Sequence, residues 1–125
     1  MPKKILLVDD EELVIKSVSK LLNKQGYEVL TCDAGEDAIN AIRKENFDLI
    51  VCDIRMPRMT GTETIKQIRK ELKAKNKTSV PEILITGYAD DETNKEAEAL
   101  KVADYIYKPF DLADFLNCVN KHLKK

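Results

Sequence analysis

Short apolar runs alternate with longer segments of helical period along the whole chain, and this alternation limits the choice of fold more than any other feature. The apolar runs have the length of strands. In the segments between them, apolar residues recur every three or four positions, as on one face of a helix. Such an alternation is typical of successive strand and helix units around a parallel sheet. We therefore expect an α/β fold whose helices cover the sheet.

The apolar runs differ in a way that predicts their places in the sheet. Residues 27–32 alternate polar and apolar side chains, as a half-exposed strand does, whereas residues 49–52 and 83–85 are apolar throughout, as strands covered on both faces are. The first of these runs suits an edge and the other two suit the centre. The predicted strands are residues 4–8, 27–32, 49–52, 83–85 and 105–107.

A helix is predicted after each strand. Thr60 and Glu63 have the spacing of a capping box at the start of the third helix, and Asp111 is expected to cap the fifth. Residues 73–80 are polar and predict a loop. The apolar residues at helical spacing are Val14, Val18, Leu21 and Leu22; Ala38, Ile39 and Ile42; Ile65, Ile68 and Leu72; and Leu112, Phe115, Leu116, Val119 and Leu123.

The fourth predicted helix, residues 90–103, differs from the others. Its apolar stripe is thin and consists of Thr93, Ala97 and Leu100. A thin stripe buries little surface, so we expect this helix to be weakly anchored and the most mobile of the five.

These five units suggest a doubly wound, flavodoxin-like sheet of five parallel strands in the order 2-1-3-4-5. The order is taken from known doubly wound proteins. In such sheets, ligands bind outside the carboxyl ends of the strands, where the strand order reverses between the first and third strands. The residues that follow each strand are therefore the candidates for a functional site.

Polar and charged residues stand at four of these strand ends. Asp9 and Asp10 follow the first strand, Asp53 the third, Thr86 the fourth and Lys108 the fifth. Because the carboxyl ends of parallel strands meet at one edge of the sheet, we expect these side chains to share one cleft.

Three carboxylates in one cleft repel one another, so either their pKa values rise or a cation lies among them. Oxygen ligands without histidine or cysteine point to a hard ion, Mg²⁺ or Mn²⁺. A carboxylate beside such an ion is suited to phosphoryl chemistry. Lys108 and the Thr86 hydroxyl are the residue types that would contact the phosphoryl oxygens, and an acyl phosphate on Asp53 would result.

The composition narrows the remaining classes of function. With 21 Lys and Arg against 22 Asp and Glu, the net charge of -1 gives no reason to expect nucleic acid or an anionic membrane as a partner. The first apolar run is too short for a signal peptide or a membrane span. We expect one domain over residues 1–125, in a soluble cytoplasmic protein.

Cysteine and histidine residues are given no role in this chemistry. Cys32, Cys52 and Cys118 are odd in number and lack the Cys-x-x-Cys spacing, which argues against disulfides and a zinc site and favours packed thiols. His122 is expected to lie far from the acidic edge. Arg69 and the lysines around it are expected to form a solvated helix face.

The chain resembles the receiver domain of response regulators, from two-component signalling systems, over essentially its whole length. The segments that carry the resemblance are ILLVDDEE at residues 5–12, DLIVCDIRMPRMTG at residues 48–61, ILITGYA at residues 83–89 and YIYKPF at residues 105–110.

The resemblance implies roles for the acidic residues. Asp53 would be the phosphoacceptor. Asp10 and, to a lesser degree, Asp9 would hold the Mg²⁺ or Mn²⁺ ion directly or through water, together with Asp53. The backbone carbonyl of Arg55 would be a further metal ligand.

The resemblance also implies a switch. Thr86 and Lys108 would bind the phosphoryl group, and the Lys108–Pro109 bond would be cis. Tyr105 would change orientation as Thr86 moves, altering the face formed by the fourth helix, fifth strand and fifth helix. Arg55 and Tyr88 are predicted to border the path of attacking water and to slow hydrolysis of the acyl phosphate.

The resemblance further implies that a histidine kinase or a histidine phosphotransfer protein donates the phosphoryl group. Specificity for the donor would lie on the first helix and the loops near it. The downstream effector is not identified, and the phosphorylated protein could dimerise through the exposed fourth helix and fifth strand. The sequence fits a single-domain regulator as well as part of a longer one.

Plainer interpretations exist for each residue taken alone. Asp9 and Asp10 could cap a helix, Asp53 could belong to a turn, and Lys108 could be a surface lysine. Their joint placement at separate strand ends favours one shared reaction.

Three other functions compete with the phosphorylation switch, which would catalyse only its own phosphorylation and dephosphorylation. A Mg²⁺-dependent phosphohydrolase would need an acid–base aspartate one residue from the nucleophile, and a cap for the substrate. A flavin-binding module would need small residues after the first strand, where this chain has Asp9 and Asp10. A scaffold that has lost phosphorylation would not need every chemical position to be filled.

Overall fold

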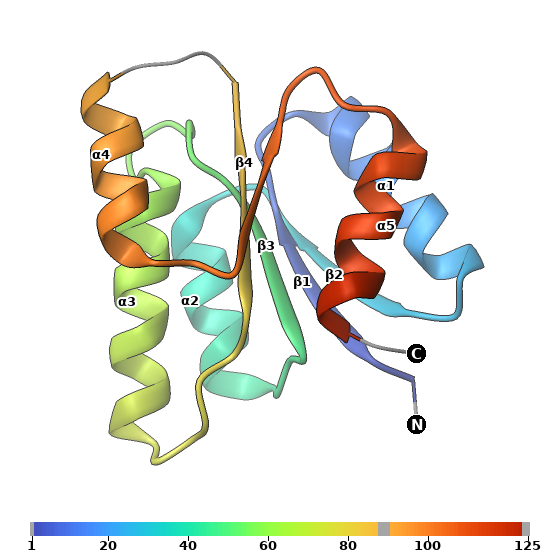
Figure 1. Ribbon diagram of the computed structural model, residues 1–125. Coiled ribbons are helices and arrows are strands. Elements are labelled where there is room, and N and C mark those ends of the chain that lie inside the picture. Colours follow the sequence, from blue (N-terminus) through green and yellow to red (C-terminus); the bar gives the residue numbers. More distant parts are fainter. Residues whose placement is uncertain (1, 88–90, 124–125) are drawn as a thin grey trace.

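The computed structural model describes residues 2–87 and 91–123, with the backbone alone for residues 91–94. One parallel sheet of five strands lies between two layers of helices (Figure 1). The elements follow one another as β1 (Lys4–Val8), α1 (Glu12–Lys24), β2 (Glu28–Cys32), α2 (Gly35–Lys44), β3 (Leu49–Asp53), α3 (Gly61–Ala74), β4 (Glu82–Thr86), α4 (Asp91–Leu100), β5 (Asp104–Tyr107) and α5 (Leu112–Leu123).

The strand order is β2-β1-β3-β4-β5, which confirms the predicted fold. All neighbouring strands are parallel. Every residue of β3 and β4 is buried, whereas β2 lies at an edge and leaves Glu28 and Thr31 exposed. The continuous apolar patterns thus correctly predicted the central strands, and the alternating pattern correctly predicted an edge strand.

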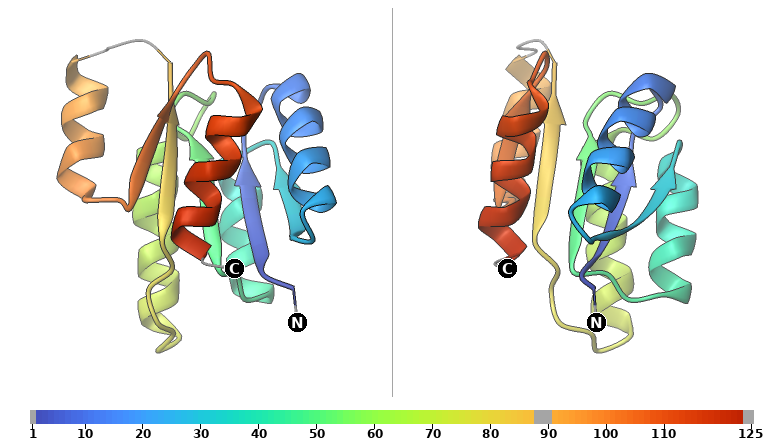
Figure 2. Two further views of the ribbon diagram at one scale, coloured as in Figure 1. Left: turned by 45° about the vertical axis from the view of Figure 1, so that its right-hand side comes forward. Right: turned by 90° about the vertical axis from the view of Figure 1, so that its right-hand side faces the viewer.

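Helices cover both faces of the sheet (Figure 2). Helices α2, α3 and α4 pack on one face, and α1 and α5 pack on the other. Successive side chains of a strand point to opposite faces. In β1, Leu6 therefore joins the core under α2 and α3, and Leu7 joins the core under α1 and α5. Among the described residues, no helix combines the length and apolar character needed to cross a membrane.

Both predicted helix caps are present. The Thr60 side chain accepts a hydrogen bond from the Glu63 backbone N–H, and the Glu63 carboxylate accepts one from the Thr60 backbone N–H. At the start of α5, the Asp111 carboxylate accepts a hydrogen bond from the Asp114 backbone N–H at 2.8 Å. These caps satisfy backbone groups that the first turn of a helix leaves without partners.

Helix α4 is shorter than predicted at its carboxyl end. It ends at Leu100, because Lys101 adopts a left-handed conformation with φ 52° that a helix cannot continue. The chain then turns toward the sheet, where the Ala103 N–H donates to the Glu82 carbonyl at 2.9 Å. The side chain of Thr93 and all of Asp90 lie outside the described residues. The mobility expected of this helix stays a prediction.

Three further details correct the sequence-based predictions. Helix α3 extends to Ala74, so the loop begins later than residue 73. Leu112 does not face the core but is 41% exposed, because in the first turn of α5 it lines a surface groove. Arg69 does not belong to a freely solvated face, since its guanidinium donates two hydrogen bonds to Glu82, at 2.9 and 2.6 Å.

Candidate functional site

The backbone fixes the residues that follow the strands. The Asp9 N–H donates to the Cys32 carbonyl at 3.0 Å, and the Lys108 N–H donates to the Thr86 carbonyl at 2.7 Å. These bonds extend the ladders between strands past their last residues. The side chains at this edge are consequently held by the sheet and not by mobile loops.

A glycine allows the loop after β3 to close over the end of the strand. The Gly61 N–H donates to the Ile54 carbonyl at 2.7 Å. A Cβ atom at position 61 would lie 2.1 Å from the Asp53 carbonyl oxygen, a separation that no side chain permits. The first turn of α3 therefore packs directly on the backbone beside Asp53.

Asp9, Asp10 and Asp53 meet at this edge, as predicted. Each offers one carboxylate oxygen, and the three oxygens lie within 4.8 Å of one another. Asp9 is fully buried and Asp53 is 4% exposed, whereas Asp10 is exposed. The cluster thus extends from the interior of the protein to the solvent.

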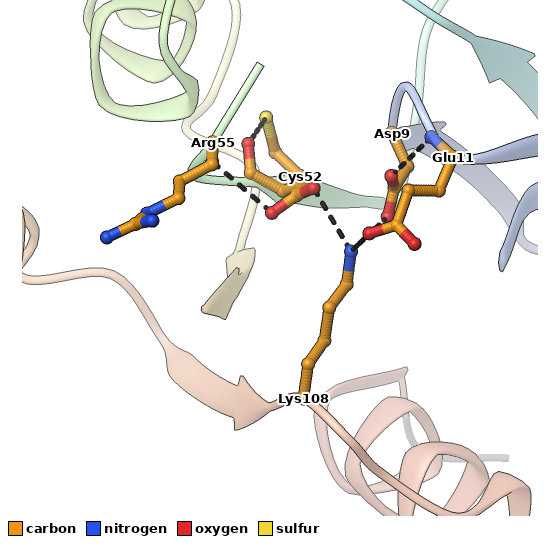
Figure 3. Close-up of polar contacts among 6 residues, drawn as sticks. Asp9, Glu11, Cys52, Arg55 and Lys108 are labelled. Carbon is orange, nitrogen blue, oxygen red and sulfur yellow. Dashed lines mark hydrogen bonds and ion pairs between the residues drawn. The ribbon is translucent and has the colours of Figure 1, made fainter. Parts of the chain in front are cut away.

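Lys108 reaches into the same cluster from the end of β5 (Figure 3). Its Nζ lies 3.2 Å from Asp53 Oδ2 and 3.4 Å from Asp9 Oδ2. The same ammonium forms an ion pair with Glu11. Sequence reasoning did not anticipate the contact with Glu11, because the pairing depends on where α1 begins relative to β5. One ammonium thus lies among several carboxylates.

The burial of these charges shifts their pKa values. Burial raises the pKa of Asp9 from 3.8 to about 6, and the charge of Asp53 adds to the effect. Burial likewise raises the pKa of Asp53, although Lys108 opposes the shift. Burial by itself would lower the pKa of Lys108, but the hydrogen bond to Glu11 and the charge of Asp53 outweigh it and raise that pKa. The single ammonium of Lys108 therefore does not offset the cost of burying the two carboxylates.

The two oxygens of Asp9 differ in their partners. Oδ1 accepts a hydrogen bond from the Glu11 backbone N–H at 2.9 Å. Oδ2 is buried without a hydrogen bond, since Lys108 approaches it only as an ion pair at 3.4 Å. A buried carboxylate oxygen without a donor is costly, and a cation would remove that cost. Because all three acidic side chains offer oxygen, the site fits a hard divalent ion such as Mg²⁺.

The remaining predicted site residues lie nearby. The Arg55 N–H donates to Asp53 Oδ1 at 3.3 Å, so Arg55 directly borders the acidic residue. Thr86 ends β4 and is 4% exposed. The Lys108–Pro109 bond is cis, as predicted. The metal-binding role of the Arg55 carbonyl and the phosphoryl contact of Thr86 stay predictions.

Tyr105 connects β5 to α4. It is half-buried, and its hydroxyl donates to the Ala97 carbonyl at 2.9 Å. A change in the orientation of this side chain would have to break that bond. Tyr88, the second residue expected to slow hydrolysis, lies outside the described residues.

A partly apolar groove of about 790 Å³ leads from the surface to the acidic cluster. Asp53 and Lys108 line it together with Leu13 and Leu112. Leu13 is 80% exposed and Leu112 is 41% exposed, and both are large apolar side chains. Such exposure next to a polar site is typical of a surface that binds another molecule. Helical spacing in the sequence placed Leu112 on the inner face of the fifth helix and gave Leu13 no role, because such spacing does not distinguish core from groove.

Comparisons with known proteins agree with this geometry. The profile of the response regulator receiver domain matches residues 5–120. The transcriptional regulatory protein CrdR of Helicobacter pylori is 38% identical over 112 residues, which cover 90% of this chain and 51% of that protein. The chain spans 51% of the length of CrdR and 24% of the length of the regulatory protein AtoC of Escherichia coli.

Solved structures share the fold over nearly the whole chain. The Vibrio cholerae chemotaxis protein CheY4 superposes with a TM-score of 0.87 at 32% identity, covering 98% of this chain and 100% of that one. The receiver domain of the sensor histidine kinase PA1611 of Pseudomonas aeruginosa has a TM-score of 0.85 at 24% identity, and each chain is covered completely. The latter structure has a magnesium ion coordinated in its active site cleft.

Proposed function

Since the chain belongs to the response regulator receiver domain family, we propose that it is a phosphorylation switch whose acceptor is Asp53. The observation that carries the proposal is the position of Lys108, whose Nζ lies 3.2 Å from Asp53 Oδ2 at the buried acidic edge of the sheet. The donor would be a phosphohistidine in a histidine kinase or a histidine phosphotransfer protein. Residues 1–125 would form one receiver domain.

The transfer exchanges one bond to phosphorus for another. A carboxylate oxygen of Asp53 forms the new bond to phosphorus, and the bond from phosphorus to the donor nitrogen breaks. The imidazole leaves with the bonding electron pair and takes up a proton. Lys108 is placed to neutralise charge on the phosphoryl oxygens, since its ammonium already contacts the acceptor carboxylate.

Mg²⁺, or Mn²⁺, is the cofactor that we propose for this site. Asp9, Asp10, Asp53 and the carbonyl of Arg55 would hold it, a set supported by the buried Asp9 oxygen that has no hydrogen bond. When bound, the ion supplies positive charge close to the transferring oxygens. The magnesium in the PA1611 receiver domain belongs to a protein of the same fold and is in keeping with this choice.

Thr86 and Tyr105 would transmit the change to the surface. Thr86 ends β4 beside Lys108, whose N–H donates to its carbonyl, so a phosphoryl group bound by both residues would act on β4 and β5 together. Tyr105 lies in β5 and holds α4 through the Ala97 carbonyl. The output surface would be α4, β5 and α5. It would contact a downstream effector, or a second copy of the phosphorylated chain.

The groove beside Asp53 would receive the phosphodonor protein. Leu13 and Leu112 offer apolar contacts at its rim, and Asp53 lies within it, so a helix that carries the phosphohistidine could dock there. Leu13→Ser should slow phosphotransfer from a histidine donor protein at least tenfold and leave phosphorylation by acetyl phosphate unchanged. Ser17→Ala, which changes another lining residue without removing apolar surface, should affect neither reaction. If Leu13→Ser slows both reactions equally, the groove is not a docking site.

The direct test is the intact mass of the protein after incubation with acetyl phosphate and Mg²⁺. The wild type should gain one phosphoryl group, and Asp53→Asn should gain none. Chelation of the metal should prevent the gain in the wild type. A phosphoryl group on Asp53→Asn at the wild-type level would contradict the proposal.

We propose a switch and not an enzyme with repeated turnover of a substrate. Asp53 is followed by Ile54 and Arg55, where an aspartyl phosphatase needs an acid–base aspartate one residue beyond the nucleophile. Steady release of product from p-nitrophenyl phosphate would argue for the phosphohydrolase instead. A cytoplasmic location, expected from the three free cysteines, also belongs to this proposal.

A further inference from the structure

Asp104, Cys118 and His122 bring three kinds of metal ligand together away from the acidic cleft. Asp104 begins β5, whereas Lys108 follows the opposite end of the same strand. Each of the three offers one ligand atom, and these atoms lie within 4.8 Å of one another. Within residues 2–87 and 95–123, only the acidic cluster at Asp53 shares this property.

The distances in this second cluster are close to those of a tetrahedral zinc site. Asp104 Oδ2 lies 3.0 Å from His122 Nε2 and 3.4 Å from Cys118 Sγ. Zinc bonds of about 2.0 Å to oxygen and nitrogen and about 2.3 Å to sulfur separate neighbouring ligand atoms by about 3.3 to 3.6 Å. The two pairs that include Asp104 would therefore need only small shifts to admit the ion, and the ligand atoms of Cys118 and His122 lie within 4.8 Å of each other.

The backbone already orients all three ligands. Cys118 and His122 are four residues apart in α5, so their side chains lie on the same face of the helix. The Tyr105 N–H donates to Asp104 Oδ1 at 2.8 Å, which leaves Oδ2 directed at α5. A hydrogen bond to the oxygen that does not bind metal is a common way of fixing a carboxylate ligand.

We propose that Asp104, Cys118 and His122 bind a zinc ion, with water as the fourth ligand. Sulfur and imidazole ligands select zinc over Mg²⁺, which prefers oxygen alone. All three side chains are partly exposed, and Asp104 and Cys118 line a surface pocket through which the ion and the water can enter. The ion would tie the start of β5 to the end of α5.

Two features of the cluster disfavour zinc binding, the proton on the Cys118 thiol and the positive charge of Lys121. Burial and the Asp104 charge raise the pKa of Cys118 to about 12, so binding must release the thiol proton to solvent. Lys121 Nζ lies 3.7 Å from Asp104 Oδ2, but its side chain is 71% exposed and can turn away. The cysteine spacing argued against a zinc site, because the three ligands come from two elements and not from a Cys-x-x-Cys motif.

Titration of the purified protein with Co²⁺, followed by absorption spectroscopy, tests the proposal. The Asp53→Asn background weakens competition from the acidic cleft, and the proposal does not rest on phosphorylation of Asp53. We expect a thiolate-to-cobalt charge-transfer band, together with the visible bands of tetrahedral Co²⁺. One equivalent of Zn²⁺ should displace the cobalt and abolish both.

Variants of each ligand separate this site from other cysteines. Cys118→Ser should abolish the charge-transfer band, while Cys32→Ser should keep it. His122→Gln and Asp104→Asn should each weaken Co²⁺ binding at least tenfold, because even partners of metal ligands change affinity by about 10-fold to 100-fold. A band that survives in Cys118→Ser overturns the proposal. So does unchanged affinity in both His122→Gln and Asp104→Asn.

A measurement on the wild type guards against misfolded variants. Zn²⁺ should slow the alkylation of Cys118 by iodoacetamide, as followed by peptide mass spectrometry, and should raise the melting temperature of the protein. Cys118 alkylation at an unchanged rate in the presence of saturating Zn²⁺ would exclude the site.

Discussion

Two buried carboxylates, Glu82 and Asp9, lie at opposite ends of the sheet and differ in how completely they are bonded. Glu82 begins β4, is 5% exposed, and accepts two hydrogen bonds from the Arg69 guanidinium, at 2.9 and 2.6 Å. Asp9 follows β1, is fully buried, and leaves one oxygen without a hydrogen bond. The carboxylate of Glu82 is thus fully paired with Arg69, whereas that of Asp9 lacks a donor for one oxygen.

The difference separates a structural charge from a functional one. A buried carboxylate with a bidentate arginine fixes two elements, here α3 and β4, and leaves no capacity for another ligand. A buried carboxylate with incomplete bonding keeps a raised pKa and a free oxygen, and both are features of functional sites. Completeness of bonding, more than burial, indicates which acid can bind a cation.

The largest expected effect is the loss of stability on breaking the Arg69–Glu82 pair. Arg69→Ala leaves the Glu82 charge buried without its partner, so we expect the free energy of unfolding to fall by about 3 kcal/mol, at the lower end of the range for broken buried pairs because Arg69 is partly exposed. Urea denaturation measures the change. Arg43→Ala breaks the more exposed pair with Glu71 and should cost less than about 1 kcal/mol. Equal losses of stability in Arg69→Ala and Arg43→Ala would show that the buried pair stabilises the protein no more than the exposed one.

Removal of the Asp9 charge should instead increase the stability of the protein. Asp9→Asn removes a buried charge and keeps the shape of the side chain, so at pH 7 without divalent metal the free energy of unfolding should rise by about 1 to 3 kcal/mol. The matched control is Asp48→Asn, an exposed carboxylate that accepts a hydrogen bond from the Lys4 N–H. The control should change stability little. A loss of stability in Asp9→Asn would show that the Asp9 charge is already fully compensated.

The gain in stability of Asp9→Asn over the wild type should shrink as the pH falls. The folded state raises the pKa of Asp9 from 3.8 to about 6, so folding favours the protonated form. The contribution of Asp9 to stability is therefore full below pH 3.8 and is lost as the pH rises through about 6. The difference between Asp9→Asn and wild type should narrow from pH 7 toward pH 4, by up to about 1.4 kcal/mol per pH unit. A stability difference that widens toward pH 4 would show that folding lowers the pKa of Asp9 and does not raise it.

The smallest expected effect comes from metal binding. Mg²⁺ at five times its dissociation constant should raise the free energy of unfolding of the wild type by about 1 kcal/mol. The same Mg²⁺ concentration should stabilise Arg69→Ala equally, because Glu82 lies at the other end of the sheet, and should stabilise Asp9→Asn less. Thermal denaturation with and without Mg²⁺ measures all three. An equal response of all three proteins would exclude Asp9 from the metal site.

The sequence predicted the five strand and helix units and the acidic cluster because both depend on short-range patterns, whereas the strand order was taken from known doubly wound proteins. Runs of apolar residues mark the central strands, and the residue after each strand falls at the same edge. The sequence alone therefore places Asp9, Asp53 and Lys108 together.

What the sequence could not predict depends on long-range packing or on single backbone angles. Glu82 and Arg69 are 13 residues apart and lie in different elements, so nothing local links them. The end of α4 is set by the left-handed Lys101, and a lysine gives no sign of that conformation. The metal-ligand distances at Asp104 likewise arise from the packing of α5 beside β5.

Identification of the phosphorylated residue tests the central claim most directly. The protein is incubated with acetyl phosphate and Mg²⁺, reduced with borohydride, which converts an aspartyl phosphate to homoserine, and sequenced by tandem mass spectrometry. The phosphorylation switch proposed here predicts homoserine at position 53 and unmodified aspartate at positions 9 and 10. Homoserine at position 9 or 10, or a stable phosphate elsewhere with Asp53 unmodified, would contradict it.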